Sequence, residues 1–562
     1  MTDNRSTSYT YYPMHMHLHA GCDYGASMAM HMYNARSLGM RYLWYTDHDT
    51  RTGVKKNPVN GFSFDSPELI KEEPAGGFYG FRTTDEKITY AVEVEKRQLR
   101  LSFTATEDAQ WQESGIYFVS NGTRHTSSLS AEVTLSLDLK EVSLDKDSRL
   151  IFDVKLSQRP PECRNAHLLY VLGNTEELAE PHTQVIPVQI SCGKLIMPIS
   201  KDVLPTEEMG GKDNAFDTLT VILQAKSGAE VSVVLGDFEI QVEKSYEQVH
   251  QSLKIAAAES GKYYGITPFV SFEVSGAGEH KNCYTTSVPT IDYQKANYCV
   301  SACDAAQHIK EHNGIFAINH PFAISDLKRK VFTPVERMKI LAKMSAELIA
   351  NRAYGADLIE VGFPEGRNGF ALEEYTRLWD TLSSAGLFLT GYGCSDSHRD
   401  NKDWFTGNNF AAYLGVCAEL THPIAEETFT QAMKMGRVYT ADPVKLRGTV
   451  DFRTEWGHPM GSVFLSKSVQ EVPIVFSMTN AQPGWQFRLI ENGNLVETVP
   501  IMGETFSWES VLRLRKNTVH FQRAEVWNES GRCVLLTNPI YLIHEELFAG
   551  EIPMHRIGKE TE

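Results

Sequence analysis

The chain has 562 residues, of which 42% are hydrophobic and 22% are charged, and its formal net charge is −17 at pH 7. This length and composition predict several folded domains rather than a disordered chain. The acidic balance argues against a nucleic-acid partner, because such binding rests on a basic surface. Without a run of about 20 apolar residues or a signal-peptide pattern, we expect neither membrane insertion nor export. The 9 cysteines are scattered and form no CxxC pair, which favours a reducing, cytoplasmic location.

In chain order, "MHMHLHA", "ASMAMHMYNARSL" and "RYLWYTDHD" read as strand, helix and strand. Residues 59–245 then show short alternating runs such as "AEVTLSLDLKEV", which predict an all-β segment. Strand–helix alternation returns over residues 246–440, and residues 441–562 are β-rich again. We therefore predict an α/β domain in two parts, 1–58 and 246–440. A β-sandwich at 59–245 interrupts it, and a second β-sandwich at 441–562 follows it.

Polar residues able to bind a metal recur where the predicted strands of the α/β part end. They are His17, His19, His48, Glu273, His320, Glu360, Asp396 and His398. Parallel α/β barrels gather the carboxyl ends of their strands at one mouth, so we expect these side chains to share a pocket. Histidines and carboxylates without thiolates suit Zn, Mn or Fe, and a carboxylate such as Glu273 can bridge two cations. For Glu360 we favour a hydrogen bond to a ligand histidine over direct ligation.

Other polar residues near these strand ends leave more than one interpretation open. Strand alternation predicts that His15 shares the face of His17 and His19, where a supporting or substrate-contacting role and simple exposure are equally supported. His31, in the predicted helix, is expected to be solvated. Asp47 and Asp49 flank His48, and each suits either a supporting role at the site or a loop cap.

The ordered segments "HLHAGCD", "TDHD", "FEVSGAGEH", "INHP" and "GCSDSH" resemble the motifs of the PHP (polymerase and histidinol phosphatase) superfamily of metal-dependent hydrolases. The resemblance covers roughly residues 13–50 and 246–440. It implies a distorted seven-stranded α/β barrel of TIM-like type that holds two or three divalent metal ions. The ligands that it implies are His17, His19, Asp23, His48, Glu273, His280, His320, Asp396 and His398. Asp23 follows His19 by four residues, where five is commoner in the family.

The two β-rich segments also resemble known modules. The end of the 59–245 segment is similar to a carbohydrate-binding jelly roll. The C-terminal segment resembles the β domain of a PHP branch that includes carbamate hydrolases. These likenesses imply a small-molecule substrate, with a sugar-containing one as a possibility. They leave the oligomeric state open.

The sequence contains no GxSxG, Walker A or HExxH motif, so the expected nucleophile is a water molecule activated by metal. We expect Asp396, His398 and Glu273 to serve catalysis. Arg399 suits either a contact with a non-reacting substrate oxygen or a surface salt bridge. The leading functional hypothesis is a phosphoesterase acting on a small phosphorylated molecule. The alternatives are a carbamate, ester or amide hydrolase with the same metal cluster, and a non-catalytic glycan-binding or scaffold protein.

Overall fold

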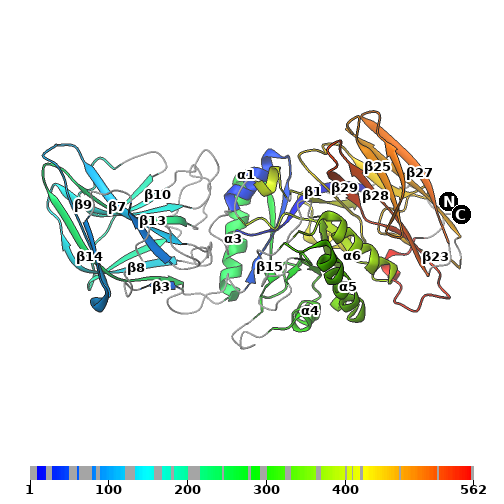
Figure 1. The fold of residues 1–562 in the computed structure, drawn as a ribbon, viewed down its shortest axis with the longest axis horizontal. Helices are drawn as coiled ribbons and strands as arrows, with labels where there is room; N and C mark the ends of the chain where they lie inside the picture. The colour runs from blue at the N-terminus through cyan, green and yellow to red at the C-terminus, as the bar shows by residue number, and fades with distance from the viewer. Residues whose placement is uncertain are drawn as a thin grey trace.

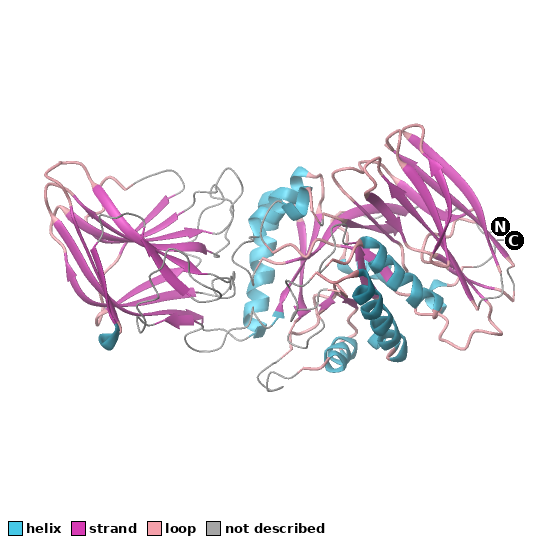
Figure 2. Ribbon diagram, in the orientation of Figure 1, coloured by secondary structure: helices cyan, strands magenta, loops and turns pink. Residues whose placement is uncertain are grey.

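The molecule is elongated, with strands at both ends and most helices in the middle (Figures 1 and 2). The computed structural model describes residues 9–20, 28–49, 60–62, 79–83, 89–120, 133–156, 167–178, 183–199, 216–242, 246–275, 280–291, 300–322, 331–362, 369–398, 402–407, 409–417, 422–467, 470–514 and 518–558. No helix within these ranges has the length and apolar character that a membrane crossing requires.

The middle region is one sheet with helices packed against it. Its strands are β1 (Tyr9–Leu18), β2 (Tyr42–His48), β15 (Thr267–Val274), β16 (Lys281–Cys283), β17 (Phe316–Ile318), β18 (Leu358–Gly362), β19 (Thr390–Gly393), β20 (Ala411–Cys417) and β21 (Val438–Ala441). Its helices are α1 (Met28–Ser37), α3 (Tyr246–Tyr264), α4 (Ala302–Glu311), α5 (Pro334–Ala350), α6 (Leu372–Ser384), α7 (Lys402–Phe405) and α8 (Glu426–Lys434), with a 3₁₀ turn at Arg352–Gly355. Every residue of β2 is buried, as expected for a strand covered on both faces.

Hydroxyl caps set the starts of two of these helices. The side chain of Ser301 accepts the backbone N–H of Asp304 at the start of α4, and Thr333 accepts that of Glu336 at the start of α5. In both helices the acidic side chain reaches back to the cap residue's own N–H, which completes a capping box.

The predicted seven-stranded α/β barrel is wrong. The structure is 44% strand and 22% helix. Its largest sheet has 15 strands and runs from the middle region into the C-terminal one. The main path has the order β19-β18-β17-β16-β15-β2-β1-β20-β21-β29-β28-β25-β26, where β29 is Cys533–Thr537, β28 is Val519–Trp527, β25 is Gln486–Glu491 and β26 is Asn494–Pro500. Two strands lie off this path, β23 (Val463–Leu465) and β30 (Ile540–Ile543). In the described chain, β19 forms a backbone ladder with β18 alone, and only the isolated bridge between Leu18 and Ser397 links the segment after β19 to β1.

Two antiparallel insertions break the parallel pattern that the barrel required. The short strand β16 is antiparallel to both β15 and β17, and β20 is antiparallel to β1. Gly393 of β19 also contacts β21, because its N–H donates to the hydroxyl of Thr440 at 2.7 Å. The strand–helix alternation of the sequence fixes the parallel pairs but says nothing about these additions.

The region between β2 and α3 is a two-sheet β structure. It contains β3 (Asn60–Phe62), β4 (Tyr79–Thr83), β5 (Thr89–Glu93), β6 (Gln98–Thr104), β7 (Gln112–Ser120), β8 (Val133–Ser143), β9 (Ser148–Leu156), β10 (His167–Gly173), β11 (Thr183–Pro187), β12 (Lys194–Ile199), β13 (Phe216–Ala225) and β14 (Glu230–Val242), with a 3₁₀ turn at Val94–Lys96. One sheet has the order β11-β10-β9-β13-β7-β4, and the other contains β12-β8-β14-β6-β5 with β3 beside β14. Asn60 pairs with Ile240, so the two ends of this insertion lie side by side.

The C-terminal region continues the large sheet and adds a smaller one. Its elements are β22 (Val450–Thr454), β23 (Val463–Leu465), β24 (Glu471–Thr479), β25 (Gln486–Glu491), β26 (Asn494–Pro500), β27 (Thr505–Arg513), β28 (Val519–Trp527), β29 (Cys533–Thr537), β30 (Ile540–Ile543) and a 3₁₀ turn at Met554–Arg556. The small sheet β22-β24-β27 packs on the large one, where the rings of Phe476 and Phe487 lie 4.9 Å apart. Pairing of β21 with β29 joins this region to the middle one.

Candidate metal centre

The candidate residues meet where parallel strands end. The strands β1, β2 and β15 run parallel, as do β17, β18 and β19, and two antiparallel pairings through β16 give both sets the same direction. Their carboxyl ends therefore lie along one edge. The side chains gathered there are those of His17, His19, His48, Glu273, His280, His320, Glu360, Asp396 and His398.

Glu273, on β15, is at the centre of the cluster and is fully buried. Its Oε1 lies 3.0 Å from His280 Nδ1 and 3.4 Å from the Nε2 atoms of both His17 and His320. Its Oε2 contacts His48 Nδ1 and lies 4.0 Å from His19 Nε2. The two oxygens thus face different histidines, which is the arrangement of a carboxylate able to bridge two cations.

A second group of histidines surrounds the carboxylate of Asp396, which follows the end of β19. Its Oδ1 lies 3.0 Å from His19 Nε2, 3.2 Å from His17 Nε2 and 3.4 Å from His398 Nδ1. Its Oδ2 lies 4.0 Å from His320 Nε2. His17 therefore faces both central carboxylates, and the two groups of ligand atoms form one continuous pocket.

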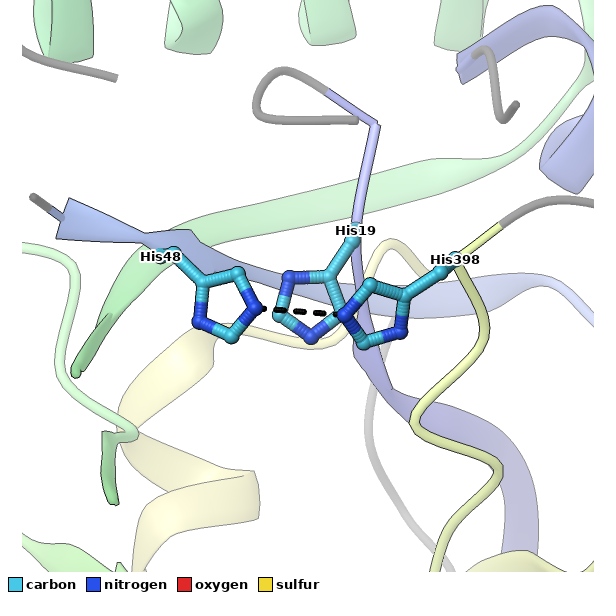
Figure 3. Close-up of side chains that lie close together, drawn as sticks. All are labelled: His19, His48 and His398. Atoms are coloured by element: carbon cyan, nitrogen blue, oxygen red, sulfur yellow. Dashed lines mark hydrogen bonds between the residues drawn. The ribbon is translucent and has the colours of Figure 1, made fainter. Parts of the chain in front are cut away.

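Three imidazoles converge beside this pocket (Figure 3). His48 Nε2 and His398 Nε2 lie 3.2 Å apart, and the ring of His19 lies 4.1 Å from that of His398. The Nδ1–H of His398 donates to the backbone oxygen of Asp396 at 2.8 Å, so its Nε2 is the atom directed at His48. His19, His48 and His398 offer nitrogens within 4.8 Å of one another.

These separations match those of atoms bound to a common metal ion. Two ligand atoms on one tetrahedral zinc, each at about 2.0–2.1 Å, are separated by roughly 3.3 Å. The pairs measured here fall between 3.0 and 3.4 Å for His19–Asp396, His17–Asp396, His48–His398 and His17–Glu273. His17 Nε2 and Glu273 Oε2 are buried atoms without a hydrogen-bond partner among the described residues. The donor set therefore fits metal ions.

The backbone at three of these residues is strained. His17 has φ 58°, Asp396 has φ 49° and His320 has φ 20°, in a region that residues other than glycine rarely adopt. At His17 the strain accompanies a register shift between β1 and β2, from His15 to Leu18. Such irregularities redirect side chains next to functional sites.

This bulge overturns the expectation that His15 shares the face of His17 and His19. The ring of His15 instead packs on Trp404, with centroids 4.1 Å apart, and its Nδ1 lies 3.3 Å from Ser395 Oγ. His15 is fully buried, and burial lowers its pKa to about 3.

The expectation of a solvated His31 is also wrong, because its side chain is fully buried behind the site. Its Nε2–H donates to the backbone oxygen of His19 at 2.9 Å, and its Nδ1 accepts the indole N–H of Trp404 at 3.0 Å. Burial lowers the pKa of His31 to about 4. His31 is a neutral residue that positions the segment carrying His19.

Glu360, on β18, forms the hydrogen bond favoured from the sequence. Its Oε1 accepts His17 Nδ1–H at 2.6 Å and the hydroxyl of Tyr392 at 2.8 Å, and its Oε2 accepts the backbone N–H of His320 at 2.5 Å. The bond from His17 Nδ1–H to Glu360 fixes the tautomer of His17 and directs its Nε2 into the pocket. This arrangement is usual for metal-bound histidines.

Electrostatics link these groups. Burial by itself opposes ionisation of Glu273, yet His280, His48 and His17 hold its pKa well below its ordinary value. Burial likewise opposes protonation of His17, but Glu360, Asp396 and Glu273 raise its pKa well above the ordinary value. The histidines thus favour the ionised form of Glu273, and the carboxylates in turn favour the protonated form of His17.

Asp47 and Asp49 each accept a backbone N–H from a neighbouring strand end. Asp47 Oδ1 accepts the backbone N–H of Ala20 at 2.8 Å, and Asp49 Oδ1 accepts that of Ser275 at 3.2 Å. Each aspartate ties the end of one strand to its neighbour. Asp23 and Arg399 lie outside the described residues, so their predicted roles stay predictions.

Sequence reasoning missed several residues that support the centre. Asn319 Nδ2 donates to Glu273 Oε1 at 2.7 Å, and its Oδ1 accepts the backbone N–H of Asn282. Asn282 Nδ2 lies 3.3 Å from Glu360 Oε1, and the hydroxyls of Tyr284 and Tyr392 lie 2.9 Å apart. Only Asn319 carried a usable signal, because it directly precedes His320 in "INHP".

Comparisons with known proteins do not assign the chain to a family. No protein-family profile and no curated protein matches the chain. An exo-β-agarase structure aligns with 34% of this chain and 25% of its own, at 10% identity and a TM-score of 0.17. A β-glucuronidase of Bacteroides uniformis aligns with 79% of this chain and 61% of its own, at 10% identity and a TM-score of 0.16. Likenesses this weak carry no inference about fold or function.

Proposed function

We propose that this protein is a metal-dependent hydrolase that acts on phosphate esters of small molecules. The observation that carries the proposal is the convergence of six histidines on two buried carboxylates, Glu273 and Asp396. When bound, two or three divalent ions of zinc, manganese or iron would supply an activated water and neutralise charge on the reacting oxygens. The ordered motifs that resemble those of PHP hydrolases support the same chemistry.

The residues of the chain have separable tasks in this proposal. Glu273 and Asp396 would hold and bridge the cations, and the histidines would complete their coordination. Glu360 would keep His17 in the tautomer that offers Nε2 to the pocket, since it accepts the Nδ1–H at 2.6 Å. Asn319 would orient Glu273 through its 2.7 Å hydrogen bond.

The charge of the pocket favours an anionic substrate despite the acidic protein. Two divalent cations would exceed the negative charges of Glu273, Asp396 and Glu360 by one, and a third would widen that excess. Among the described residues no Lys or Arg contacts Glu273. A loaded centre would therefore be a local positive region suited to a phosphoryl group.

The test is a substrate screen on protein of defined metal content. The purified chain is stripped with a chelator, reloaded separately with zinc, manganese or ferrous iron, and assayed on p-nitrophenyl phosphate, p-nitrophenyl acetate and an aryl carbamate. We expect metal-dependent release of phosphate. Hydrolysis of the ester or carbamate alone would overturn the phosphoester assignment. Metal binding without hydrolysis of any substrate would overturn the enzyme assignment.

A further inference from the structure

A cavity between the middle and C-terminal regions lies away from the candidate metal centre. Its volume is about 630 Å³, within the roughly 300–1,000 Å³ that small-molecule sites occupy. One wall is the face of β1, β20 and β21 that carries Tyr11, Tyr413 and Tyr439, and the other wall is formed by β22 and the segment that precedes it. At about 3.3 Å per residue, the stretch of β1 from Tyr11 to His17 spans roughly 20 Å. A ligand in this cavity would therefore bind apart from the metal centre.

The ring of Tyr11 is held in place by the strands beneath it. Gly415 lies opposite Tyr11 on β20, and a Cβ atom at Gly415 would come within 2.7 Å of Tyr11 Cε1, so the ring rests on the backbone of the glycine. The ring centroids of Tyr11 and Tyr439 lie 5.1 Å apart. Tyr439 in turn stacks on Tyr413, with centroids 4.6 Å apart. The position of Tyr11 is thus set before any ligand binds.

The hydroxyl of Tyr11 is available to a ligand. Its oxygen is a buried atom without a hydrogen-bond partner among the described residues. Burial, followed by the carboxylate of Asp451, raises the pKa of Tyr11 well above its ordinary value, so the hydroxyl keeps its proton. A buried donor that lacks an acceptor is unfavourable. The cavity therefore favours a ligand that carries a hydrogen-bond acceptor.

The charged side chains that line the cavity are those of Arg447, Arg453 and Asp451. Arg453 Nε donates to Asp451 Oδ2 at 2.6 Å, so these two charges compensate each other. Arg447 Nη1 donates to the backbone oxygen of Leu38 at 3.1 Å, and that oxygen carries no formal charge. The lining therefore has an excess of one positive charge, in a chain whose net charge is −17. This local excess favours a ligand with a single negative charge.

The rest of the lining is largely apolar and includes flat rings. Besides the tyrosines it contains Pro13, Leu38, Met40, Pro443, Leu446 and Val450. Contacts between aromatic rings add stabilisation beyond the burial of apolar area, which favours an aromatic ligand over an aliphatic chain. A carboxylate supplies the single charge and can accept hydrogen bonds from a hydroxyl and a guanidinium together.

We propose that this cavity binds an aromatic monocarboxylate, and that it does so independently of the metal centre. The carboxylate accepts hydrogen bonds from the hydroxyl of Tyr11 and the guanidinium of Arg447. The aromatic rings of the ligand lie against Pro443, Leu446 and Val450. The ion pair of Asp451 and Arg453 stays intact beside the bound ligand.

The test is isothermal titration calorimetry of the full chain, with naphthylacetate and biphenylcarboxylate as probes. The primary amides of the two acids are the neutral comparisons, and decanoate is the aliphatic one. We expect at least one aromatic carboxylate to bind, and its amide to bind at least about fivefold more weakly, because the amide lacks the charge that Arg447 attracts. The affinity should be equal for metal-loaded and chelator-treated protein.

Two variants remove the proposed contacts one at a time. Tyr11→Phe removes only the hydroxyl and should weaken binding about tenfold, the effect of one lost hydrogen bond to a charged group. Arg447→Gln should weaken it about fivefold, because the guanidinium is exposed and partly screened. Tyr354→Phe, which removes a hydroxyl bonded to Glu347, and Arg513→Gln, at an exposed ion pair, are the matched controls. Each control should change binding less than twofold.

Several outcomes would overturn the proposal. These are failure of both aromatic carboxylates to bind, equal affinity for the acids and their amides, and tighter binding of decanoate than of either aromatic acid. Binding that requires metal would place the ligand at the metal centre instead. Unchanged affinity in both Tyr11→Phe and Arg447→Gln, with circular dichroism like that of the parent, would place it elsewhere on the surface. Because the measurement requires no turnover, failure of the phosphoesterase proposal leaves this result unaffected.

Discussion

Two clusters in this molecule bury carboxylates, and they differ in the groups that surround the buried charge. Between α6 and β28, Arg523 donates to Asp380 at 2.8 and 2.7 Å and to Glu525 at 2.6 Å, and Trp527 Nε1 donates to Glu525 at 2.7 Å. That cluster carries its own cation. The candidate metal centre instead surrounds its central carboxylate with histidines, and no described Lys or Arg contacts Glu273.

The difference identifies which cluster is structural and which is prepared for a ligand. A buried carboxylate needs a positive partner, because desolvation penalises its charge. At Asp380 the partner is covalently part of the chain and joins the middle region to the C-terminal one. At Glu273 the charged neighbours are imidazoles, whose lone pairs can bind a metal that supplies the positive charge.

The largest expected effect is on turnover. Asp396→Asn keeps the volume of the side chain but removes the charge that the centre offers to cations. On whichever substrate responds in the screen, we expect kcat/KM to fall by about 10³-fold or more. Asp451→Asn, at an exposed pair with Arg453, is the control and should retain activity. A fully active Asp396→Asn variant would remove this residue from the centre.

Substitutions in the cluster of Arg523, Asp380 and Glu525 should change the stability of the fold rather than turnover. Arg523→Met leaves Asp380 and Glu525 buried without their cation, so we expect a loss of about 3–5 kcal/mol in the free energy of unfolding. Urea denaturation measures it, and the loss should be equal with and without added metal. Arg513→Met breaks an exposed pair with Glu471 and should cost at most about 1 kcal/mol. Equal losses in the two variants would contradict the assignment of Arg523 as the internal cation.

The support of the centre is expected to matter less than its ligands. Glu360→Gln weakens the acceptor that fixes His17, so affinity for zinc or manganese should fall about 10–100-fold in competition with a chelator. Glu347→Gln is a suitable control, because Glu347 Oε1 also accepts a tyrosine hydroxyl, that of Tyr354, but lies on α5. Unchanged metal affinity in Glu360→Gln would show that His17 is held by other means.

The sequence was sufficient to identify the main ligand candidates. It was not sufficient to predict how the strands that carry them pair. Hydrophobic runs that end in His48, Glu273 or His320 reveal where strands stop, since each side chain follows a buried segment. The hydrogen bond of Glu360 to His17 was also predictable, because metal-site histidines usually carry such a partner.

The remaining features depend on contacts between residues far apart in the sequence, which local sequence patterns do not reveal. The antiparallel strand β16 has three residues, which are too few for a periodic signal in the sequence. The strands expected to form a barrel belong instead to a mixed sheet of 15 strands. The bulge at His17 reverses the side-chain alternation on which the placement of His15 depended. Tyr392 and Asn282 reach Glu360 from separate strands, and no short motif records such a contact.

The smallest expected effect concerns a buried histidine without a carboxylate partner among the residues that the structure describes. His250, on α3, is 2% exposed, and its Nε2–H donates to the backbone oxygen of Ser271 at 3.2 Å. Burial, with a smaller contribution from Lys254, lowers the pKa of His250 to about 4. The folded state therefore keeps this side chain neutral at pH values where the unfolded chain, with a pKa of about 6.5, already binds a proton.

Stability from this group is complete above the unfolded pKa and is lost as pH falls from 6.5 towards 4. Between pH 7.5 and 5, metal-free parent protein should lose about 2 kcal/mol more unfolding free energy than His250→Gln, whose amide can still donate to Ser271. His312→Gln, at an exposed position, should show the same pH dependence as the parent. Parallel pH profiles for the parent and His250→Gln would mean that His250 becomes protonated in the folded protein. Burial without a carboxylate partner would then be insufficient to keep a histidine neutral here, which would weaken the electrostatic contrast between the two clusters.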